Sequence, residues 1–556
     1  MFKSTANPQF RTALSETIFN QKYKHDGCET WSDLARTLVL DVDNQNRLKK
    51  DEQELLTSYI SDLKFIPGGR YLYYAGRDTK FYNNCYLLRV EEDTREEWAQ
   101  AGWKAFRCLA TGGGIGFDYS ILRPSGARLK RTGGIASGPI SLMHAVNEIG
   151  RQVMQGGSRR SAIYASLNHQ HADIDRFLHY KDWSKIKVPG TDKTLSDLKA
   201  LDFNYPAPLD MTNISVNYDT RWLLSYYKTQ DVGEVFRRNV EQAITTGEPG
   251  FSFNFFDREN ETLRNACTEV TSEDDSDVCN LGSVNLSRID SISELASVVA
   301  LATKFLLLGT LRAELPYQKI YDVREKNRRL GLGLMGIHEW LIQRSMKYEV
   351  TQELHQWLSV WRGVSDDVSK AFARELSIST PVANRAIAPT GTIGMLAGTT
   401  TGIEPVFAVA YKRRYLVDGT KWKYQYAVDH IANEFIEKYG VDPESIETSS
   451  GLASDYERRI RFQADIQDYV DMGISSTINL PARGDQKFSV EEFASVLAKY
   501  APRLRGFTAY PDGSRGGQPL TLVPYYEAKL RLGQEFEEGV EFNDICEVTG
   551  GGHCGT

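Results

Sequence analysis

Two neighbouring stretches near the middle of the chain carry most of its information: Arg-Asn-Ala-Cys-Thr-Glu-Val at residues 264–270 and Asp-Val-Cys-Asn-Leu-Gly-Ser-Val-Asn-Leu at residues 277–286. Asn265, Cys267 and Glu269 alternate along the first stretch. In an extended or looped segment, alternate side chains point the same way, so one surface would carry an amide, a thiol and a carboxylate. That surface suits a sulfur nucleophile or radical beside an acid/base. A buried cysteine next to a capped turn has the same pattern.

Strand-like and helix-like patterns alternate on both sides of these stretches. Residues 1–65 have apolar side chains at helical spacing, and the sequence pattern changes at residue 66. Short β-leaning runs then alternate with helical patterns, at residues 82–90, 161–167, 214–216 and 386–388. This alternation indicates an α/β fold with a buried, largely parallel sheet. After Gly506 the chain becomes rich in turns, and residues 521–556 are typical of a flexible tail.

Composition narrows the class of protein. Hydrophobic residues make up 41% and charged residues 25%, as in globular proteins. The net charge of −7 argues against nucleic acid or an anionic membrane as the main partner. The apolar run from Leu295 to Leu311 is interrupted by Lys304 and favours a buried helix over a membrane span. Seven cysteines without a C-x-x-C pair indicate a reducing, cytoplasmic compartment and a catalytic role for any cysteine pair.

The run Gly-Leu-Gly-Leu-Met-Gly at residues 331–336 matches the G-x-G-x-x-G dinucleotide fingerprint. That fingerprint must follow an apolar strand, and here the charged run Arg-Glu-Lys-Asn-Arg-Arg at residues 324–329 precedes it. We therefore predict a glycine-packed turn that opens a helix near residues 338–342.

A second glycine motif, Ala-Pro-Thr-Gly-Thr-Ile-Gly, occupies residues 388–394. Pro389 fixes a turn, two threonines offer hydroxyls, and the glycines let backbone amides approach an anion. A helix beginning here would add its N-terminal amides and dipole. These residues fit a phosphate cradle and an ordinary capped turn equally well.

The remaining cysteines lack such surroundings. Cys28 and Cys108 have no polar constellation and are interpreted as packing residues. Cys546 and Cys554, with His553, offer only three ligands at a spacing that no usual zinc module has, so no metal site is predicted. Incidental cysteines in a disordered tail and a flexible dithiol arm both fit the last two.

Several segments occur together, in order, between about residues 65 and 520: Asn83-Asn-Cys-Tyr, Gly113-Gly-Ile-Gly, Gly133-Gly-Ile-Ala-Ser-Gly-Pro with Gln155-Gly-Gly-Ser-Arg-Arg, Asn265-Ala-Cys-Thr-Glu, Cys279-Asn-Leu-Gly-Ser-Val-Asn-Leu, Arg329-Leu-Gly-Leu-Gly-Leu-Met-Gly, Ala388-Pro-Thr-Gly-Thr-Ile, Thr401-Gly-Ile-Glu-Pro, Ser475-Ser-Thr-Ile-Asn-Leu-Pro and Gly506-Phe-Thr-Ala-Tyr-Pro-Asp-Gly-Ser-Arg. In these segments the chain resembles the large catalytic subunit of ribonucleotide reductases, and most of all the adenosylcobalamin-dependent class.

The resemblance implies a ten-stranded α/β barrel of two parallel five-stranded halves over residues 66–520, with a central finger loop. A helical region at residues 1–65 would precede it, and a C-terminal tail with redox cysteines at residues 521–556 would follow. It also implies reduction of ribonucleotides to 2′-deoxyribonucleotides.

Residue roles transfer with the motifs. Cys267 would become the thiyl radical that abstracts the 3′-hydrogen, Glu269 the general base on the 3′-hydroxyl, and Asn265 the holder of the substrate hydroxyls. Cys85 and Cys279 would be the dithiol that reduces the substrate and closes to a disulfide. An acid/base and a thiol pair together can manage the loss of a hydroxyl as water.

The resemblance extends to binding residues. Substrate contacts are implied for Asn84, Gly114, Pro389, Thr390, Gly391, Thr392 and Ile393, the last five through its phosphates. Contacts to an effector deoxynucleotide are implied for Asp93, Thr94, Arg123, Gln155 and Arg159. Cys546 and Cys554 would re-reduce the disulfide and be restored by a thioredoxin-like donor. In dimeric relatives the effector lies at a subunit interface, so a homodimer is a hypothesis.

The radical source has alternatives. A diferric partner subunit would need a tyrosine relay, for which Tyr525 and Tyr526 are candidates. A glycyl radical would need a signature that residues 550–554 do not resemble. Adenosylcobalamin is the cofactor that the resemblance favours. The alternative is the catalytic subunit of an iron-dependent reductase. An inactive nucleotide-binding regulator on the same barrel is disfavoured by the three active-site cysteines.

Overall fold

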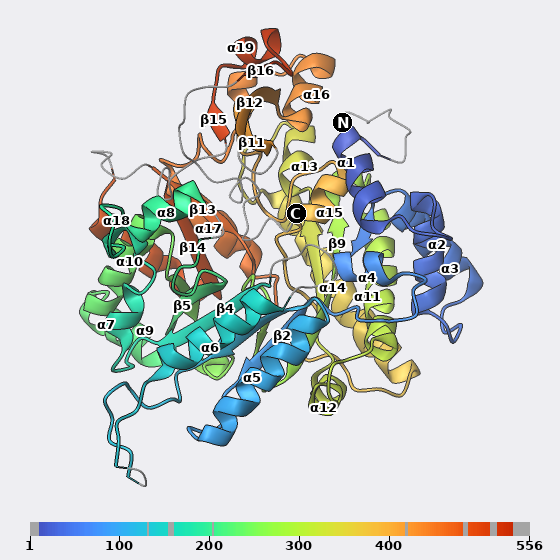
Figure 1. The fold of residues 1–556 in the computed structure, drawn as a ribbon. Coiled ribbons are helices and arrows are strands. Elements are labelled where there is room, and N and C mark those ends of the chain that lie inside the picture. The colour runs from blue at the N-terminus through green and yellow to red at the C-terminus, as the bar shows by residue number, and fades with distance from the viewer. Residues whose placement is uncertain are drawn as a thin grey trace.

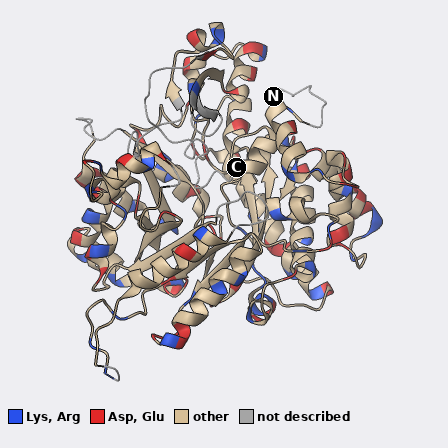
Figure 2. Cartoon of the chain, viewed as in Figure 1, with Lys and Arg blue, Asp and Glu red and all other residues tan. Residues whose placement is uncertain are grey.

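The computed structural model describes residues 10–130, 133–153, 161–202, 205–417, 421–481, 488–511 and 520–536. Its centre is a large sheet, wrapped by helices (Figure 1). Figure 2 shows that acidic and basic residues are interspersed along the outer helices.

One half of the sheet has five strands, each parallel to its neighbour: β2 (Cys85–Arg89), β3 (Gly114–Asp118), β4 (Ile163–Asn168), β5 (Thr212–Tyr218) and β6 (Gly250–Phe253). The helices that connect these strands are α5 (Arg95–Ala110), α6 (Pro139–Gln152), α7 (Ile174–Leu178), α8 (Leu195–Leu201), α9 (Thr220–Thr229) and α10 (Glu234–Thr246). Parallel neighbours require such crossovers, and the strands are buried nearly throughout, as sheets covered by helices are.

The other half contains β9 (Asp277–Asn285), β10 (Leu330–Met335), β13 (Thr477–Leu480) and β14 (Gly506–Pro511), with parallel pairing of β9 to β10 and of β13 to β14. Segment 383–388 fills the gap between β10 and β13. The amides of Leu330 and Leu332 donate to the carbonyls of Ala383 and Asn384, at 2.9 Å and 3.0 Å. On the other side, Ile387 bridges to Ile474 in parallel.

The two halves meet antiparallel, at β2 with β9 and at β6 with β14. With segment 383–388 as the fifth member of the second half, the hydrogen bonds run round the full circle. The predicted ten-stranded barrel of two parallel five-stranded halves is confirmed.

Further helices belong to the N-terminal region and to the second half of the barrel. They are α1 (Ala13–Ile18), α2 (Trp31–Val42), α3 (Lys50–Ser61), α4 (Gly69–Tyr74), α11 (Ile292–Arg312), α12 (Gln318–Asn327), α13 (Ile337–Gln343), α14 (Gln352–Glu375), α15 (Gly391–Ala397), α17 (Tyr456–Gln467) and α18 (Val490–Tyr500), with the short strand β1 (Phe65–Pro67). The N-terminal helices share one hydrophobic core with α11, α14 and β9. In the part of the chain that the structure describes, α11 alone is long and apolar enough to cross a membrane. Of its most apolar window, 61% is buried inside the protein.

The glycine run at residues 331–336 differs from its predicted turn. Five of its residues belong to the buried strand β10, and only Gly336, with φ of 72°, turns into α13. A Cβ on Gly331 would lie 2.3 Å from Leu281 Cδ2, and one on Gly333 would lie 2.7 Å from the Ala386 carbonyl oxygen. The glycines therefore let neighbouring strands approach closely. The same glycine spacing also occurs in turns, which is why the sequence predicted one.

A second, four-stranded antiparallel sheet comprises β15 (Leu520–Leu522), β11 (Ala410–Val417), β12 (Lys421–Val428) and β16 (Glu535–Phe536), with helices α16 (His430–Tyr439) and α19 (Tyr525–Leu530) beside it (Figure 1). Residues from 521 to 536, which the sequence places in the tail, thus belong to regular structure. Tyr525 and Ala528 are buried with Ala410 and Tyr426, because strands more than 100 residues away in sequence complete the sheet.

A finger loop joins β6 to β9. It contains a short antiparallel pair, β7 (Leu263–Arg264) and β8 (Thr271–Ser272). The loop lies against the barrel strand β3, where a Cβ on Gly116 would be 1.8 Å from the carbonyl oxygen of Arg264. Residues 265–270 form the tip between the two short strands, so the barrel walls surround the thiol-bearing stretch.

Candidate active site

Cys85 and Cys279 face each other across neighbouring strands. They are direct partners in the antiparallel register of β2 and β9. Directly opposed residues project to the same face with Cα atoms roughly 4.5–5.5 Å apart, within the span that a disulfide bridges. Both are buried free thiols in one small apolar cluster. A disulfide can therefore form here with little movement of the backbone.

The tip of the finger loop contacts this pair through Asn265. Its Nδ2 lies 3.0 Å from Cys85 Sγ, and its Oδ1 accepts the Val270 amide at 2.9 Å. Thr268 has the left-handed φ of 71°, and its amide donates to the Asn265 carbonyl at 3.0 Å, which closes the turn. The amide side chain thus holds the loop tip and one strand thiol together.

Glu269 is a buried carboxyl group with few hydrogen bonds to offset its loss of hydration. It is 1% exposed, and its Oε2 has no hydrogen-bond partner among the described residues. Burial raises its pKa to about 7, against a smaller opposing effect of the Asn265 amide. A carboxyl group with this pKa can accept and return a proton near neutral pH.

The three thiols stay protonated. Burial, and then the negative charge of Glu269, raises the pKa of Cys267 and Cys85 above the ordinary thiol value. Burial, followed by the charges of Asp277 and Glu269, does the same for Cys279. Thiolates are the nucleophilic form of cysteine, so this environment disfavours a sulfur nucleophile. It preserves the S–H bonds that hydrogen-atom transfer requires.

The thiols differ in accessibility. Cys267 is partly exposed, whereas Cys85 and Cys279 are buried. Of the three thiols, the loop thiol is therefore the one that a reactant can reach without movement of the barrel.

Asn84 and Gly114 lie beside the thiol pair. The Gly114 amide donates to the Asn84 carbonyl at 2.8 Å, and the Asn84 side-chain oxygen is buried without a hydrogen-bond partner among the described residues. A Cβ on Gly114 would lie 3.2 Å from the Cβ of Ala266 on the finger loop. The structure therefore places Gly114 against the loop tip and Asn84 beside Gly114.

The turn at residues 389–393 follows directly from the barrel wall. Ala388 packs against the apolar cluster that contains Cys85 and Cys279. Thr390 has φ of 54°, and its hydroxyl accepts the Gly402 amide at 2.8 Å, so it stabilises the turn itself. The helix α15 begins at Gly391, whose added Cβ would meet nothing within 4 Å. An anion can approach this helix N-terminus from open space.

The predicted effector residues lie away from the thiols, where α5 begins. Arg123 forms an ion pair with Asp93, and its amide also donates to that carboxylate at 3.1 Å. The hydroxyl of Thr94 caps α5 by accepting the Glu97 amide. Four predicted residues fall outside the described ranges: Gln155, Arg159, Cys546 and Cys554.

Sequence reasoning missed Gly473. Its amide donates to the Glu269 carbonyl at 2.7 Å, and its added Cβ would lie 2.9 Å from the Thr268 carbonyl oxygen. Gly473 therefore supports the backbone of the turn that contains Glu269. Only its place beside the quoted segment that begins at Ser475 hinted at this role.

The model of the ribonucleotide reductase barrel domain family matches residues 83–356 and 382–501. The chain belongs to the ribonucleotide reductase family. The vitamin B12-dependent ribonucleoside-diphosphate reductase of Mycobacterium tuberculosis strain H37Rv is 28% identical over 541 residues, which cover 87% of this chain and 74% of that protein. Its counterpart in Thermoplasma acidophilum is 27% identical over 521 residues, which cover 83% of this chain and 65% of that protein.

Among solved structures, the Actinobacillus ureae class Id ribonucleotide reductase alpha subunit superposes with a TM-score of 0.71. The match covers 91% of this chain and 98% of that one at 16% identity. A likeness at this identity supports the reductase barrel fold that the strand pairing establishes.

Proposed function

We propose that this member of the reductase family reduces ribonucleotides to 2′-deoxyribonucleotides by thiyl-radical chemistry. One observation carries the proposal: a strand-borne thiol pair in disulfide register lies beside a loop-borne thiol and a buried carboxyl group. The B12 dependence of its relatives in M. tuberculosis and T. acidophilum supports the adenosylcobalamin-dependent class.

The number of electrons that the reaction needs identifies Cys85 and Cys279 as the reducing pair. Loss of the 2′-hydroxyl as water needs two electrons and two protons. Cys85 and Cys279 supply both when their two S–H bonds are replaced by one S–S bond. Cys267, as the thiyl radical, takes the 3′-hydrogen atom and returns it at the end, so it is regenerated and the pair alone is consumed.

The polar residues of the site transfer a proton and bind the substrate. Glu269 accepts the 3′-hydroxyl proton, a role that its pKa near 7 supports. Asn265 and Asn84 hold the ribose hydroxyls, and Gly114 leaves room for the sugar. The amides at the start of α15, with the turn from Pro389 to Ile393, bind the phosphates.

Adenosylcobalamin, when bound, supplies the radical that turns the Cys267 thiol into its reactive form. The residues present fit that requirement on one point, since Cys267 is the partly exposed member of the three thiols.

The iron-dependent alternative would require a radical partner and a tyrosine relay. Tyr525 packs in the core of the small sheet and donates to Glu437 at 2.8 Å, while Tyr526 is 71% exposed. Tyr525 is therefore a packing residue of the small sheet.

The direct test incubates the purified chain with adenosylcobalamin, a ribonucleotide and dithiothreitol. We expect deoxyribonucleotide from the wild type and none from Cys267→Ala. Absence of product from the wild type, with product appearing on addition of an iron-loaded radical subunit, would reject the cobalamin class and select the alternative.

We further propose that an effector deoxynucleotide binds near Asp93, Thr94 and Arg123, where α5 begins, and that a homodimer forms at α5 and α6. Trp103 and Phe106 on α5 are 47% and 54% exposed. A groove of about 600 Å³ between the two helices is lined by Phe106, Ala110, Ala145, Glu148, Ile149, Gln152 and Val153. Large exposed aromatic side chains beside an apolar groove are typical of an interface. Sizing with and without dTTP tests this, and a strict monomer in both samples would reject it.

The reducing side of the cycle is also a proposal. Cys546 and Cys554 would pass electrons from a thioredoxin-like donor to the Cys85–Cys279 disulfide. A cytoplasmic location follows from the same chemistry, and it is supported by the cysteines in the described ranges, all of them free thiols.

A further inference from the structure

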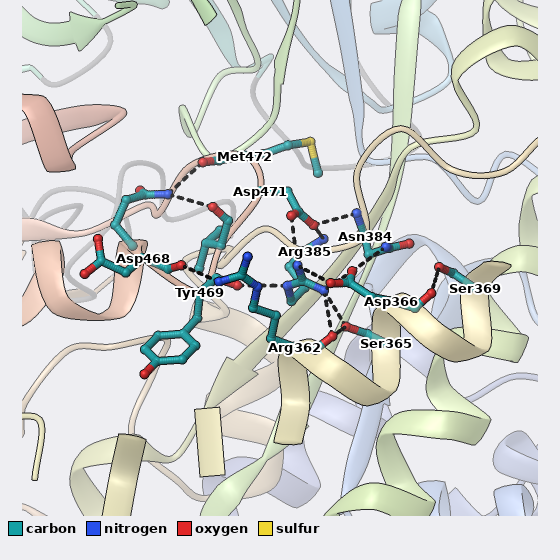
Figure 3. Close-up of polar contacts among 12 residues, drawn as sticks. Arg362, Ser365, Asp366, Ser369, Asn384, Arg385, Asp468, Tyr469, Asp471 and Met472 are labelled. Carbon is teal, nitrogen blue, oxygen red and sulfur yellow. Dashed lines mark hydrogen bonds and ion pairs between the residues drawn. The ribbon is translucent and has the colours of Figure 1, made fainter. Parts of the chain in front are cut away.

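A buried arginine joins two segments of the second half-barrel. Arg385 lies in segment 383–388 and is 1% exposed. Figure 3 shows its guanidinium between Asp366 of α14 and Asp471 of the loop before β13. The nitrogen–oxygen distances are 2.6 Å and 2.8 Å. These three residues are called the Arg385 clamp below.

The guanidinium has partners at every nitrogen. Nε donates to the Tyr469 carbonyl at 2.8 Å, and Nη1 also donates to the Ser365 hydroxyl at 2.6 Å and the Arg362 carbonyl at 3.1 Å (Figure 3). Such a fork of fixed donors is a geometry that lysine cannot reproduce. The arginine thereby ties α14, the barrel wall and the loop at residues 468–473 together.

The carboxylates complete the clamp. Asp471 accepts the backbone amides of Asn384 at 2.9 Å and Arg385 at 3.1 Å through its second oxygen. Burial alone would raise the pKa of Asp366, and the hydrogen bond and charge of Arg385 outweigh it, so that pKa lies below its ordinary value. Removal of the arginine would leave both carboxylates without their cationic partner, although amide donors from Asn384 would remain on each.

The clamped loop continues to the carboxyl-bearing turn of the finger loop. Two residues after Asp471, the Gly473 amide donates to the Glu269 carbonyl at 2.7 Å, and the Gly473 carbonyl accepts the Ile387 amide at 3.1 Å. The same barrel segment that carries Arg385 runs on into the turn at residues 389–393. One side chain is therefore linked to the proposed base and to the proposed phosphate site.

We propose that Arg385 is a positioning residue that sets Glu269 and the phosphate turn at a fixed separation, so that the ribose and its phosphates are held together for proton transfer. This inference rests on the proposed function. A displacement of reacting groups by about 1 Å can cost roughly 100-fold in rate.

The test compares Arg385→Met and Arg385→Lys with Arg344→Met as a matched control. Arg344 also pairs with a carboxylate of α14, Glu353 at 3.0 Å, but has no bond to the loop at residues 468–473. We expect kcat to fall about 100-fold in Arg385→Met and less in Arg385→Lys, because lysine keeps the charge but loses the fork. Arg344→Met should keep kcat after correction for the folded fraction.

The pH dependence separates positioning from general destabilisation. The titratable groups that interact with Glu269 are the thiols of Cys267, Cys85 and Cys279. A loosened turn admits water and removes the burial that raises the carboxyl pKa, so the acid limb of kcat in Arg385→Met should move to lower pH. An unchanged limb, with a fall in kcat that is equal at all pH values, would overturn the inference.

Hydrogen exchange gives a readout that does not depend on turnover. Arg385→Met should exchange faster at the Gly473 and Ile387 amides, while α11 keeps its protection. Wild-type exchange at both amides would overturn the inference even if the enzyme proves active. Conversely, faster exchange in a chain without reductase activity would reject the proposed function and leave the mechanical link established.

Discussion

The Cys85–Cys279 pair lies on two regular barrel strands, whereas Cys267 lies at the tip of a loop that the barrel surrounds. The strand pair is buried and in fixed register, and the loop thiol is partly exposed. A pair that must close to a disulfide gains from rigid opposition, because the allowed geometry is narrow. A thiol that must meet a radical source and then a substrate gains from access. The fold thus separates electron storage from radical transfer.

Cys267→Ala tests the loop side and should have the largest effect. We expect deoxyribonucleotide formation to fall to background while ribonucleotide binding remains, because the change removes one sulfur and no phosphate contact. Product assay and equilibrium dialysis measure the two properties. Cys108→Ala, at a buried packing cysteine, is the control and should keep turnover; measurable turnover in Cys267→Ala would overturn the assignment.

A single turnover without added reductant tests the strand side. We expect one disulfide between Cys85 and Cys279, found by mass spectrometry of the digested protein, and a free thiol at Cys267. The register of β2 and β9 makes that bond accessible without rearrangement. Product formation with both strand thiols still free would contradict the proposed division.

Glu269→Gln should lower kcat by roughly 100- to 10,000-fold, the usual contribution of a positioned acid/base. In the wild type, kcat should rise with pH through about 7 as the carboxyl group ionises. Turnover that does not depend on pH between 5 and 8 would argue against a proton-accepting role for this residue.

The same substitution should change stability with the opposite sign. The folded-state pKa of Glu269, about 7, lies above its ordinary value of 4.5, so folding favours the protonated form. That stability is complete below pH 4.5 and is lost as pH rises through 7. Glu269→Gln should therefore be neutral in acid and stabilising at pH 8, by up to about 3 kcal/mol. Urea unfolding at the two pH values measures the difference.

How much of this follows from sequence depends on the range of the contacts. The helix α2 lies within residues 1–65, where the sequence predicts helices, because apolar spacing is a local pattern. The site thiols are found through the resemblance of whole segments to one family, because the spacing of Asn265, Cys267 and Glu269 alone also fits a buried cysteine. The closure of the barrel at segment 383–388 cannot be found from local sequence patterns. The partners of this segment are β10 and Ile474, and neither is near it in sequence.

Two features were not predicted from the sequence because their sequence patterns fit two different structures. Glycines at 331 and 333 suggest a turn, but they serve a crowded strand. Arg385 resembles any surface arginine until Asp366 and Asp471, 19 and 86 residues away, are placed beside it. Propensity describes single segments, and these positions are set by packing between segments.

Gly331→Ala should have the smallest effect and probes the rigidity of the strand pair. Its added Cβ would lie 3.1 Å from Cys279 Sγ and 2.3 Å from Leu281 Cδ2, so these two side chains of β9 must move aside. Overpacking of this kind costs about 1–3 kcal/mol of stability. If rigid opposition matters, re-oxidation of the Cys85–Cys279 pair slows several-fold, whereas the first hydrogen abstraction at Cys267 keeps its rate. Equal slowing of both steps would show that the loop thiol and the strand pair are mechanically coupled, and the comparison between them would then lose its basis.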